Sequence, residues 1–483
     1  MKSQIIFILI IIIAFGCTEN PEETHLPVTQ EVKGSLSKIA ELTDQFLQSE
    51  SKKGFSGAVM IFEDGKPIFQ KGYGYTDVNQ SIPIDENTLF DMGSITKTFT
   101  ATAILKLEEL GKLTTEDLIT KYFEGVPKEK QEITLHHLLT HSSGLQGVIG
   151  HDYDAATTED FLQKMWQSKL VFPIGEGYEY SNVGYSLLGM IIEKVSNEEY
   201  DSFLQKNIFQ PAGMENTGYT TKGTEMQKVA HGINQKGEDW GNPKAKNWNG
   251  KSPFWHLKAN GGLLTTSHDM GKWCEAILEN KILQPATWKK QMNGYVNEGE
   301  DTFYGYGVVE FQKGKHYGHN GGNGIFRADW HFFPEKKSAF FVVSNSANVP
   351  LFQVSDDLLN IIMTEKLPRS MSLEMVDIKS FPANKAQHTA DEFLKTIQSF
   401  NEKNVEKFID EKFTKGMVER NSKEQLIKMF KQLENEFKGA ELESIATAEN
   451  FIELKLNGEM DMLKLNIEFL DGKIDRFGVQ AGD

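Results

Sequence analysis

The chain has 483 residues, enough for two domains, and its 39% hydrophobic and 25% charged residues are typical of a globular protein. Its 51 basic and 68 acidic residues give a formal net charge of −17, which disfavours contact with nucleic-acid phosphates. We therefore expect no nucleic-acid partner, whereas neutral, zwitterionic and cationic small molecules remain open as substrates.

The N-terminus is similar to a bacterial lipoprotein signal. Lys2 precedes an apolar run at residues 5–15, which is shorter than the roughly 20 residues that span a bilayer. Cys17 follows, and then a polar segment. We expect residues 1–17 to be the signal, Cys17 to carry a lipid anchor and residues 18–34 to be a linker, in an exported protein anchored in the periplasm or at the cell surface. A plain signal peptide and an N-terminal anchor helix are the alternatives.

Cysteine use predicts a protein without disulfides. Cys17 and Cys274 are the only two cysteines, so lipidation or removal of the first leaves the second without a partner. Cys274 lies on the apolar face of a predicted helix in MGKWCEAIL, and we expect a buried, unreactive thiol.

The first structured segments are predicted to be a β-hairpin and a helix. In FSGAVMIFEDGKPIFQKGYGYTD, Asp64-Gly65 supplies a turn with positive φ between two strands. The following segment, residues 89–113, has helical periodicity and Gly111 as its end. Its predicted apolar side consists of Ile104, Leu105, Leu107 and Leu110.

Strand character returns late in the first domain. Residues 114–300 are predicted to be helices and loops, whereas YGYGVVEF and GIFRADWHFFPEKKSAFFVVSN are rich in β-formers and LFQVSDDLLNIIM closes the region as a helix. We expect an α/β domain over residues 35–365. Its antiparallel sheet comes from both ends of the domain and is flanked by helices, with a helical subdomain inserted between them.

A second, smaller domain is predicted at the C-terminus. Residues 366–388 are expected to be a linker, and residues 389–483 contain two amphipathic helices followed by alternating strands. This small α+β domain resembles nuclear-transport-factor-like and cystatin-like folds. We find no catalytic set in it and expect a packing or partner role.

Ser94 and Lys97 stand one helical turn apart in LFDMGSITKTFTATAILKLEELGKL. A helix start presents free N–H groups and partial positive charge, which favour an anion. A buried lysine loses pKa and can then take a proton from a serine hydroxyl. A capping serine and a solvated lysine are the ordinary alternative.

Two later segments support a catalytic interpretation. FPIGEGYEYSNVGYSLLGMII contains Tyr180 and Asn182 in a Gly-flanked loop before a helix, and YGHNGGNGIF contains His319 before a strand. A phenol can share a proton with Lys97, an amide can orient a substrate, and a glycine-rich strand lets a carbonyl approach backbone N–H groups. A core tyrosine, a turn asparagine and a structural histidine are the respective alternatives.

These segments together resemble the serine β-lactamase and penicillin-binding-protein superfamily, in its class C-like branch of esterases, D-amino-acid peptidases and β-lactamases. The three motifs are Ser94-Ile95-Thr96-Lys97, Tyr180-Ser181-Asn182 and His319-Asn320-Gly321, and the segments ITLHHLLTHSSGL and ANGGLLTTSHDMGKW extend the resemblance. It covers about residues 35–365 and implies a β-lactamase/transpeptidase-like fold.

The resemblance also implies roles for single residues. Ser94 is the acylated nucleophile, Lys97 its proton partner and Tyr180 the general base and acid. Asn182, His319, Asn320 and Gly321 are expected to bind substrate, with His319 as an electrostatic member of the strand edge. The N–H groups of Ser94 and Gly322 would form the oxyanion hole.

The third motif departs from the usual Lys-Thr-Gly, which weakens the fixed positive charge for a substrate carboxylate. We therefore expect an esterase or D-amino-acid peptidase acting on an ester, peptide or lactam carbonyl, without metal or cofactor. A β-lactamase or D-alanyl-D-alanine carboxypeptidase is the enzymatic alternative. A slowly deacylating penicillin-binding sensor or cell-wall-binding protein is the alternative from another class.

Two further features stay open in the sequence. His137 and His141 are four residues apart and could share a helix face as zinc ligands, although no third ligand is evident. Trp240, Trp248 and Trp255 lie in or beside the loop at residues 237–254, where they would either line a substrate site or pin a long loop.

Overall fold

A computed structural model describes residues 37–220, 229–246, 248, 252–299, 301–368, 371, 373–448, 450–458 and 462–481. The predicted signal, Cys17 and the linker at residues 18–34 lie outside this part of the chain. Within it, every helix is too short or too polar to cross a bilayer.

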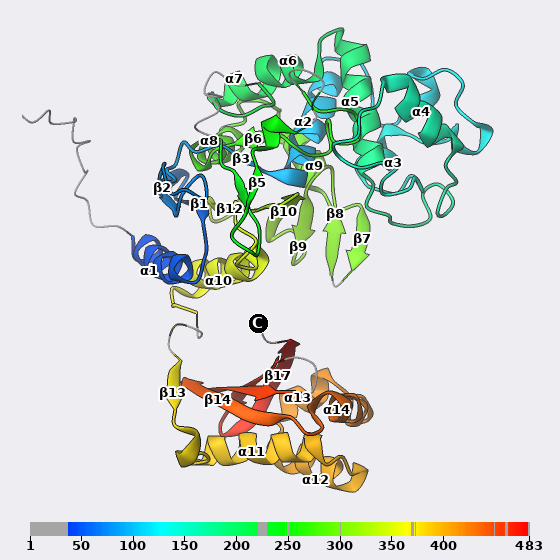
Figure 1. Cartoon of the computed structure of the whole chain (residues 1–483). Helices are drawn as coiled ribbons and strands as arrows, with labels where there is room; N and C mark the ends of the chain where they lie inside the picture. Colours follow the sequence, from blue (N-terminus) through cyan, green and yellow to red (C-terminus); the bar gives the residue numbers. More distant parts are fainter. Residues whose placement is uncertain are drawn as a thin grey trace, which may run out of the picture. The chain divides into compact units, whose positions relative to one another are not determined.

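Eight strands of the described residues form one antiparallel sheet in the order β2-β1-β12-β11-β10-β9-β8-β7 (Figure 1). Their bounds are β1 (Gly57–Glu63), β2 (Lys66–Tyr73), β7 (Val296–Gly299), β8 (Thr302–Tyr304), β9 (Val309–Phe311), β10 (His316–Asn323), β11 (Phe326–Phe333) and β12 (Ser338–Ser344). Because β1 pairs with β12, the sheet joins the start of the domain to its end, as predicted.

Alternating side chains of the sheet enter two hydrophobic cores. Val59 and Ile61 of β1 pack with the helices α1 (Lys38–Lys52) and α10 (Leu351–Thr364). Met60 and Phe62 face the opposite way and join a larger core. That core also contains residues of α2 (Thr96–Glu109) and α8 (Ser267–Leu278). The period-2 alternation of β1 therefore places helices on both faces of the sheet.

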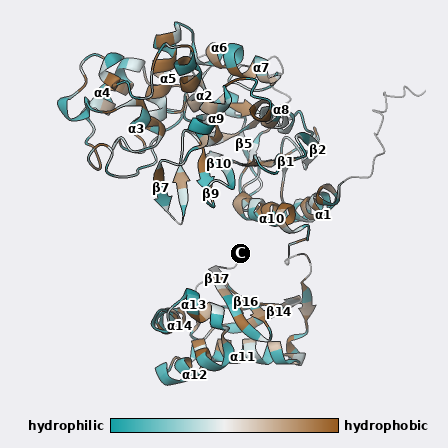
Figure 2. Cartoon of the chain, turned by 180° about the vertical axis from the view of Figure 1, so that it is seen from behind, coloured by the Kyte–Doolittle hydropathy of each residue, from teal (hydrophilic) through white to brown (hydrophobic). Residues whose placement is uncertain are grey.

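The inserted region is helical, as expected, with short strand pairs. Its helices are α3 (Leu135–Leu139), α4 (Thr158–Gln167), α5 (Asn182–Ser196), α6 (Tyr200–Leu204), the π-helical η4 (Gln205–Phe209), α7 (Gln210–Ala212) and α9 (Pro285–Met292). Short 3-10 turns are η1 (Gly93–Ile95), η2 (Ile119–Lys121), η3 (Lys128–Lys130) and η6 (Pro243–Ala245). Figure 2 shows hydrophobic residues along α5 and α8, in agreement with their buried positions.

A two-strand ladder brings distant segments to the start of α2. β3 (Phe90–Asp91) pairs with β6 (Leu264–Thr265), so Asp91 lies opposite Leu264. A second pair joins β4 (Gly232–Ile233) to β5 (Asp239–Gly241). The first ladder places the chain just before Ser94 beside the segment that contains Asn260.

The C-terminal part has its own sheet and core. In the described residues the strand order is β13-β14-β15-β16-β17, and the sheet carries four helices (Figure 1). The bounds are β13 (Glu374–Val376), η8 (Ile378–Ser380), α11 (Lys385–Gln398), α12 (Glu402–Lys412), α13 (Lys415–Arg420), α14 (Lys423–Phe437), β14 (Glu441–Ala448), β15 (Phe451–Asn457), β16 (Met462–Leu470) and β17 (Lys473–Ala481). Its core is rich in phenylalanine, with Phe393 and Phe430 ring centroids 5.3 Å apart.

The segment predicted to be a linker, residues 366–388, is partly structured. β13 pairs with β14 at the edge of the C-terminal sheet, and α11 begins at Lys385, before the expected boundary at residue 389. Val376 packs against the phenylalanine-rich core, whereas Met375 is 70% exposed. A three-residue edge strand has too short a pattern to be recognised within a polar stretch.

Candidate active site

Ser94 lies in the 3-10 turn η1, directly before α2. The turn is fixed from outside the helix, because Gly93 N–H donates to Asp91 Oδ1 at 2.8 Å. Gly93 has φ +54°, a left-handed conformation that favours glycine. Ser94 itself is half-buried, directly before the start of the helix.

Lys97 is fully buried behind Ser94. Its Nζ lies 3.1 Å from Ser94 Oγ and donates to Asn182 Oδ1 at 2.7 Å and to the main-chain oxygen of Asn260 at 2.8 Å. Burial lowers the pKa of Lys97 well below its ordinary value, and the charge of Asp152 opposes that shift only in part. The structure thus joins the first and second motifs through one amine.

Tyr180 lies on the same side of Ser94 as Lys97. Lys97 Nζ is 4.7 Å from the centroid of the Tyr180 ring and 5.6 Å from that of Tyr185. Burial raises the pKa of Tyr180, and a hydrogen bond with Ser94 opposes the rise. The phenol therefore keeps its proton near neutral pH.

The loop that carries Tyr180 is set by the cap of α5. Ser181 Oγ accepts from Gly184 N–H at 3.1 Å and donates to the main-chain oxygen of Gln146 at 2.8 Å. Asn182 N–H donates to the Gly147 oxygen at 2.9 Å. Because serine is a favoured N-cap and Asn182 begins the helix, the second motif has a defined position at a helix start.

The third motif lies in the later part of β10, which is not paired with β9. β9 pairs only with His316 to Gly318. The η1 turn approaches the following residues closely: a Cβ at Gly321 would lie 2.0 Å from the Met92 oxygen, and one at Gly93 would lie 2.4 Å from Gly322 N. This contact brings the backbone amides of Ser94 and Gly322 to one edge. Gly322 and the side chain of Asn320 are exposed there.

His319 belongs to the same cluster but carries no charge. Its Nδ1 lies 2.5 Å from the Asn320 oxygen and its Nε2 lies 2.9 Å from the Tyr304 hydroxyl. A carbonyl only accepts, so Nδ1–H donates and Nε2 accepts from Tyr304. Burial, followed by the charge of Lys97, lowers the pKa of His319 to about 4. Both nitrogens are engaged within the protein, and the lowered pKa favours a neutral ring near pH 7; the expected electrostatic role stays a prediction.

The sequence interpretation did not single out several residues of the site. Asn260 supplies its backbone oxygen to Lys97, and Asp91 joins Gly93 to Asn323 through a short contact with the Asn323 amide. Asn323 Oδ1 in turn accepts from the Tyr153 hydroxyl at 3.1 Å. Asn260, Asp91 and Asn323 all lie in segments quoted for the family resemblance. The role of Asn260 was still missed, because a backbone acceptor leaves no residue-type signal.

The two candidate zinc ligands have other partners. His137 Nδ1 accepts from Thr134 N–H at 3.2 Å, and His141 Nδ1 accepts from Ser181 N–H at 2.9 Å. Across the described part of the chain, no group of three His, Cys, Asp or Glu residues could hold a metal ion. Cys274 is buried as predicted, and burial raises the pKa of its thiol to about 12.

The three loop tryptophans pack against other parts of the described chain. Trp255 is buried and donates to Thr158 Oγ1 at 3.0 Å, and the Trp248 ring centroid lies 5.7 Å from that of Tyr219. Both therefore pin the loop. Trp240 lies against the β10–β11 turn, since a Cβ at Gly324 would be 2.3 Å from its ring.

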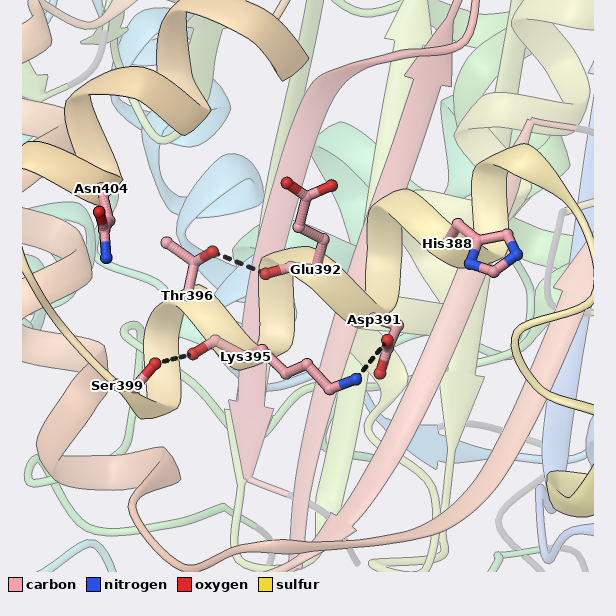
Figure 3. Close-up of a pocket in the computed structure, with 7 residues that line it drawn as sticks. All are labelled: His388, Asp391, Glu392, Lys395, Thr396, Ser399 and Asn404. Atoms are coloured by element: carbon pink, nitrogen blue, oxygen red, sulfur yellow. Dashed lines mark hydrogen bonds and ion pairs between the residues drawn. The ribbon is translucent and has the colours of Figure 1, made fainter.

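A separate hollow of about 370 Å³ lies beside α11 in the C-terminal part (Figure 3). Lys395 Nζ pairs with Asp391 at 2.7 Å, and Thr396 Oγ1 donates to the Glu392 backbone oxygen at 2.7 Å. Ser399 likewise donates to the Lys395 oxygen, so these side chains bond back to their own helix. The drawn residues form no convergent catalytic set.

Comparison with known proteins finds similar proteins in Bacillus subtilis. The chain is 29% identical over 289 residues to Penicillin-binding protein 4* of Bacillus subtilis, a match covering 56% of this chain and 64% of that protein. It is 33% identical over 254 residues to the Bacillus subtilis protein PbpX, covering 53% of this chain and 62% of that one. The matched regions thus span less than two thirds of either relative.

Solved structures give the same fold. A penicillin-binding protein from Bacillus halodurans superposes with a TM-score of 0.58 and 26% identity, covering 69% of this chain and all of that one. An octameric penicillin-binding protein homologue from Pyrococcus abyssi has a TM-score of 0.60 and 24% identity, covering 91% and 99%. The family model named Beta-lactamase matches residues 39–361, and the chain therefore belongs to the Beta-lactamase family.

Proposed function

We propose that this protein is a serine hydrolase of the class C-like branch. It acts through a Ser94 acyl-enzyme on an ester, peptide or lactam carbonyl, with an ester or D-amino-acid peptide as its substrate. The observation that carries the proposal is the position of the fully buried Lys97, whose Nζ lies 3.1 Å from Ser94 Oγ. A buried amine beside a hydroxyl is an arrangement that activates a nucleophile.

The hydrogen-bond partners of Lys97 support an uncharged amine before reaction. A neutral amine has two N–H donors and one lone pair. Asn182 and Asn260 take the two donors at 2.7 and 2.8 Å, which leaves the lone pair for the Ser94 hydroxyl. Lys97 is therefore assigned as the proton acceptor, in place of Tyr180, whose raised pKa disfavours the phenolate.

Acylation then proceeds with a balanced proton transfer. Ser94 Oγ forms a bond to the carbonyl carbon while its proton passes to Lys97 Nζ, and the carbonyl oxygen becomes an oxyanion. The N–H groups of Ser94 and Gly322 stabilise that oxyanion; loss of one such donor typically costs about 3 kcal/mol. The bond to the leaving group breaks as the proton returns from Lys97 through the Tyr180 hydroxyl. Water repeats the sequence and releases the acid from Ser94.

The remaining site residues are assigned to substrate contact or support. Asn182 holds Lys97 and offers its amide N–H groups to a substrate. The exposed Asn320 side chain borders the acyl group, and the buried Gly321 supports this edge through its contact with Met92. His319 orients Tyr304. The lack of a lysine in the third motif favours substrates without a carboxylate next to the scissile bond. This favours an esterase or aminopeptidase over an efficient β-lactamase or carboxypeptidase.

The proposal is tested with a fluorophosphonate probe, a chromogenic ester, a D-amino-acid amide and a fluorescent penicillin, each on wild type and Ser94→Ala. We expect probe labelling and ester or amide turnover in the wild type and neither in the variant. Labelling that survives Ser94→Ala would remove the proposed nucleophile. Rapid penicillin hydrolysis without ester or amide turnover would favour the β-lactamase alternative.

A penicillin-binding sensor is the second candidate, favoured by the names of the relatives, which are called penicillin-binding proteins. A sensor would be acylated once by fluorescent penicillin and would retain the label. The same assay separates it from the hydrolase by the lifetime of the acyl-enzyme.

We also propose export, with a lipid anchor at Cys17 and a C-terminal domain related to nuclear-transport-factor-like folds. The sequence pattern before Cys17 supports the anchor. Expression with a radiolabelled fatty acid tests it, because Cys17→Ala should abolish both the label and the membrane fraction of the protein.

A further inference from the structure

We infer that His141 is a positioning residue for Tyr180: it holds the backbone on both sides of the phenol and thereby fixes the phenol beside Ser94 and Lys97. This inference rests on the proposed function, since it concerns the geometry of the same site. It gives a role to a histidine that the sequence offered only as a zinc ligand.

The first observation is the hydrogen bonding of the residues that flank Tyr180. Glu179 N–H donates to the main-chain oxygen of His141 at 3.0 Å. Ser181 N–H donates to Nδ1 of the same histidine at 2.9 Å. One residue therefore accepts from the amides directly before and directly after Tyr180, which restrains the peptide planes on either side of it.

The second observation is the packing of the imidazole. The His141 ring is fully buried, and its centroid lies 4.4 Å from the centroids of both Tyr180 and Tyr304. Its backbone has φ +59°, a conformation that few residues other than Gly, Asn, Asp and His adopt readily. The turn at His141 directs its main-chain oxygen and its Nδ1 at the residues that flank Tyr180, and this turn thus depends on the residue type at position 141.

The third observation concerns the proton on the ring. Nδ1 accepts a hydrogen bond, so the proton of the neutral ring is on Nε2, which is buried and has no hydrogen-bond partner among the described residues. Burial lowers the pKa of His141 well below its ordinary value. A neutral ring keeps the Nδ1 acceptor available and adds no positive charge beside Lys97.

His141 is not assigned as a catalytic residue. No hydrogen bond in the described part of the chain joins it to Ser94, and its Nδ1 is occupied by Ser181. Its effect on the reaction passes through Tyr180.

Two neutral substitutions separate the acceptor from the ring. In His141→Asn, Oδ1 stands where Nδ1 was and asparagine tolerates the left-handed backbone. In His141→Gln, the acceptor moves one bond further out and misses the Ser181 amide. His137→Gln is the matched control, because that histidine also accepts one backbone N–H through Nδ1, but from Thr134 rather than from a residue that flanks Tyr180.

The measurement is the second-order rate constant of acylation by a fluorophosphonate, with melting temperature recorded in parallel. We expect His137→Gln to match the wild type and His141→Asn to retain most of the rate. His141→Gln should lose about 100-fold, the scale produced by a 1 Å misplacement in an active site. The shape of the pH–rate profile should be the same in His141→Asn and wild type, because His141 does not titrate in the reaction.

Hydrogen exchange tests the same inference without activity. The Ser181 amide should be protected in the wild type and His141→Asn and should exchange faster in His141→Gln. Equal rates and equal protection in the Asn and Gln variants would overturn the inference. If instead the wild type is not acylated at all, the proposed function fails, and the exchange pattern alone decides whether His141 holds the Tyr180 segment.

Discussion

Lys97 shows how a single residue can be prepared for chemistry by its surroundings alone. The amine is surrounded by three oxygen atoms, none of which carries a full charge. A lysine without a carboxylate partner in a buried site loses its proton more easily than one in water. The side chain therefore needs no metal or second cation to become a base.

This state of Lys97 predicts a pH dependence for acylation. Burial lowers the pKa of Lys97, and protonation removes the lone pair that faces Ser94. The rate constant for fluorophosphonate should therefore rise with pH through the depressed pKa of Lys97 and then level off. Lys97→Ala should lose this rise and about 10²–10⁴-fold in rate, the usual contribution of a general base.

The matched control is Lys106→Ala, on the same helix but half-buried and bonded to the Ile282 oxygen. It should retain the wild-type profile. A Lys97→Ala protein that is acylated at the wild-type rate would contradict the assignment of the base.

Asp91 predicts a pH dependence of stability. Burial raises its pKa from 3.8 to about 7, against the hydrogen bonds from Gly93 and Asn323. Between about pH 4 and about pH 7, the native state therefore keeps a proton on Asp91 that the unfolded state has released. The stabilisation from this proton is complete below about pH 4 and is lost as pH rises through about 7.

The test compares Asp91→Asn with wild type in thermal unfolding at several pH values. Asparagine does not ionise, so the melting temperature of the wild type should fall relative to the variant between pH 5 and pH 8. A constant difference across this range would show that Asp91 does not titrate there.

At the scale of elements, β10 is the strand on which the site depends. Its first residues pair with β9, whereas Gly321 approaches the Met92–Ser94 segment so closely that a side chain is excluded there. The strand therefore serves both as part of the sheet and as the wall beside Ser94. Gly318 and Gly321 are required by contact with backbone atoms rather than by positive φ.

Adjacent glycines of β10 should respond differently to alanine. A Cβ at Gly321 would lie 2.0 Å from the Met92 oxygen, which is backbone and cannot move alone. A Cβ at Gly322 would lie 3.3 Å from Arg327 Nη1, at the end of a flexible side chain. We expect Gly321→Ala to cost about 1–3 kcal/mol of stability, as overpacking does, and Gly322→Ala much less. Chemical denaturation measures both, and equal costs would contradict the close approach of η1 to β10.

The elements show which parts of the fold can be read from sequence. The Asp64-Gly65 turn has φ values of +51° and +80°, and Gly111 follows the end of α2 with φ +67°, as their local residue types predict. Leu110, expected on the apolar side of α2, is 52% exposed. The helix instead buries threonines such as Thr98 and Thr100, whose hydroxyls bond to distant backbone oxygens.

The residues of the site also differ in whether the sequence alone reveals their roles. Ser94, Lys97 and Tyr180 are recognisable because their side chains carry the chemistry. Asn260 acts through a backbone oxygen 163 positions away from Lys97, and the neutrality of His319 depends on Tyr304 and on burial. Such properties arise only when the chain is folded, because they depend on contacts that have no local pattern.

At the scale of the whole molecule, the cores of the N-terminal and C-terminal parts share no residue. The first two clusters draw on residues 39–361, and the phenylalanine-rich cluster draws on residues 390–474. Separate cores are the physical basis for separate unfolding.

Phe430→Ala should therefore weaken only the C-terminal part. Phe430 is fully buried, and truncation of a buried phenylalanine to alanine typically costs about 3–5 kcal/mol. Calorimetry should show one transition moved to lower temperature and the other unchanged, with the acylation rate of Ser94 retained. A single transition that moves as a whole would show that the two cores unfold together.

The buried thiol of Cys274 has a practical consequence. Once residues 1–17 are removed, it is the one cysteine left in the sequence, and burial together with its raised pKa keeps it from alkylating reagents. A cysteine introduced on the surface, for example in place of the exposed Met375, would then react alone with a maleimide dye. Site-directed fluorophores can therefore be attached without replacing a native cysteine. A pair of them, one on each folded part, would report how far apart the two parts lie in solution.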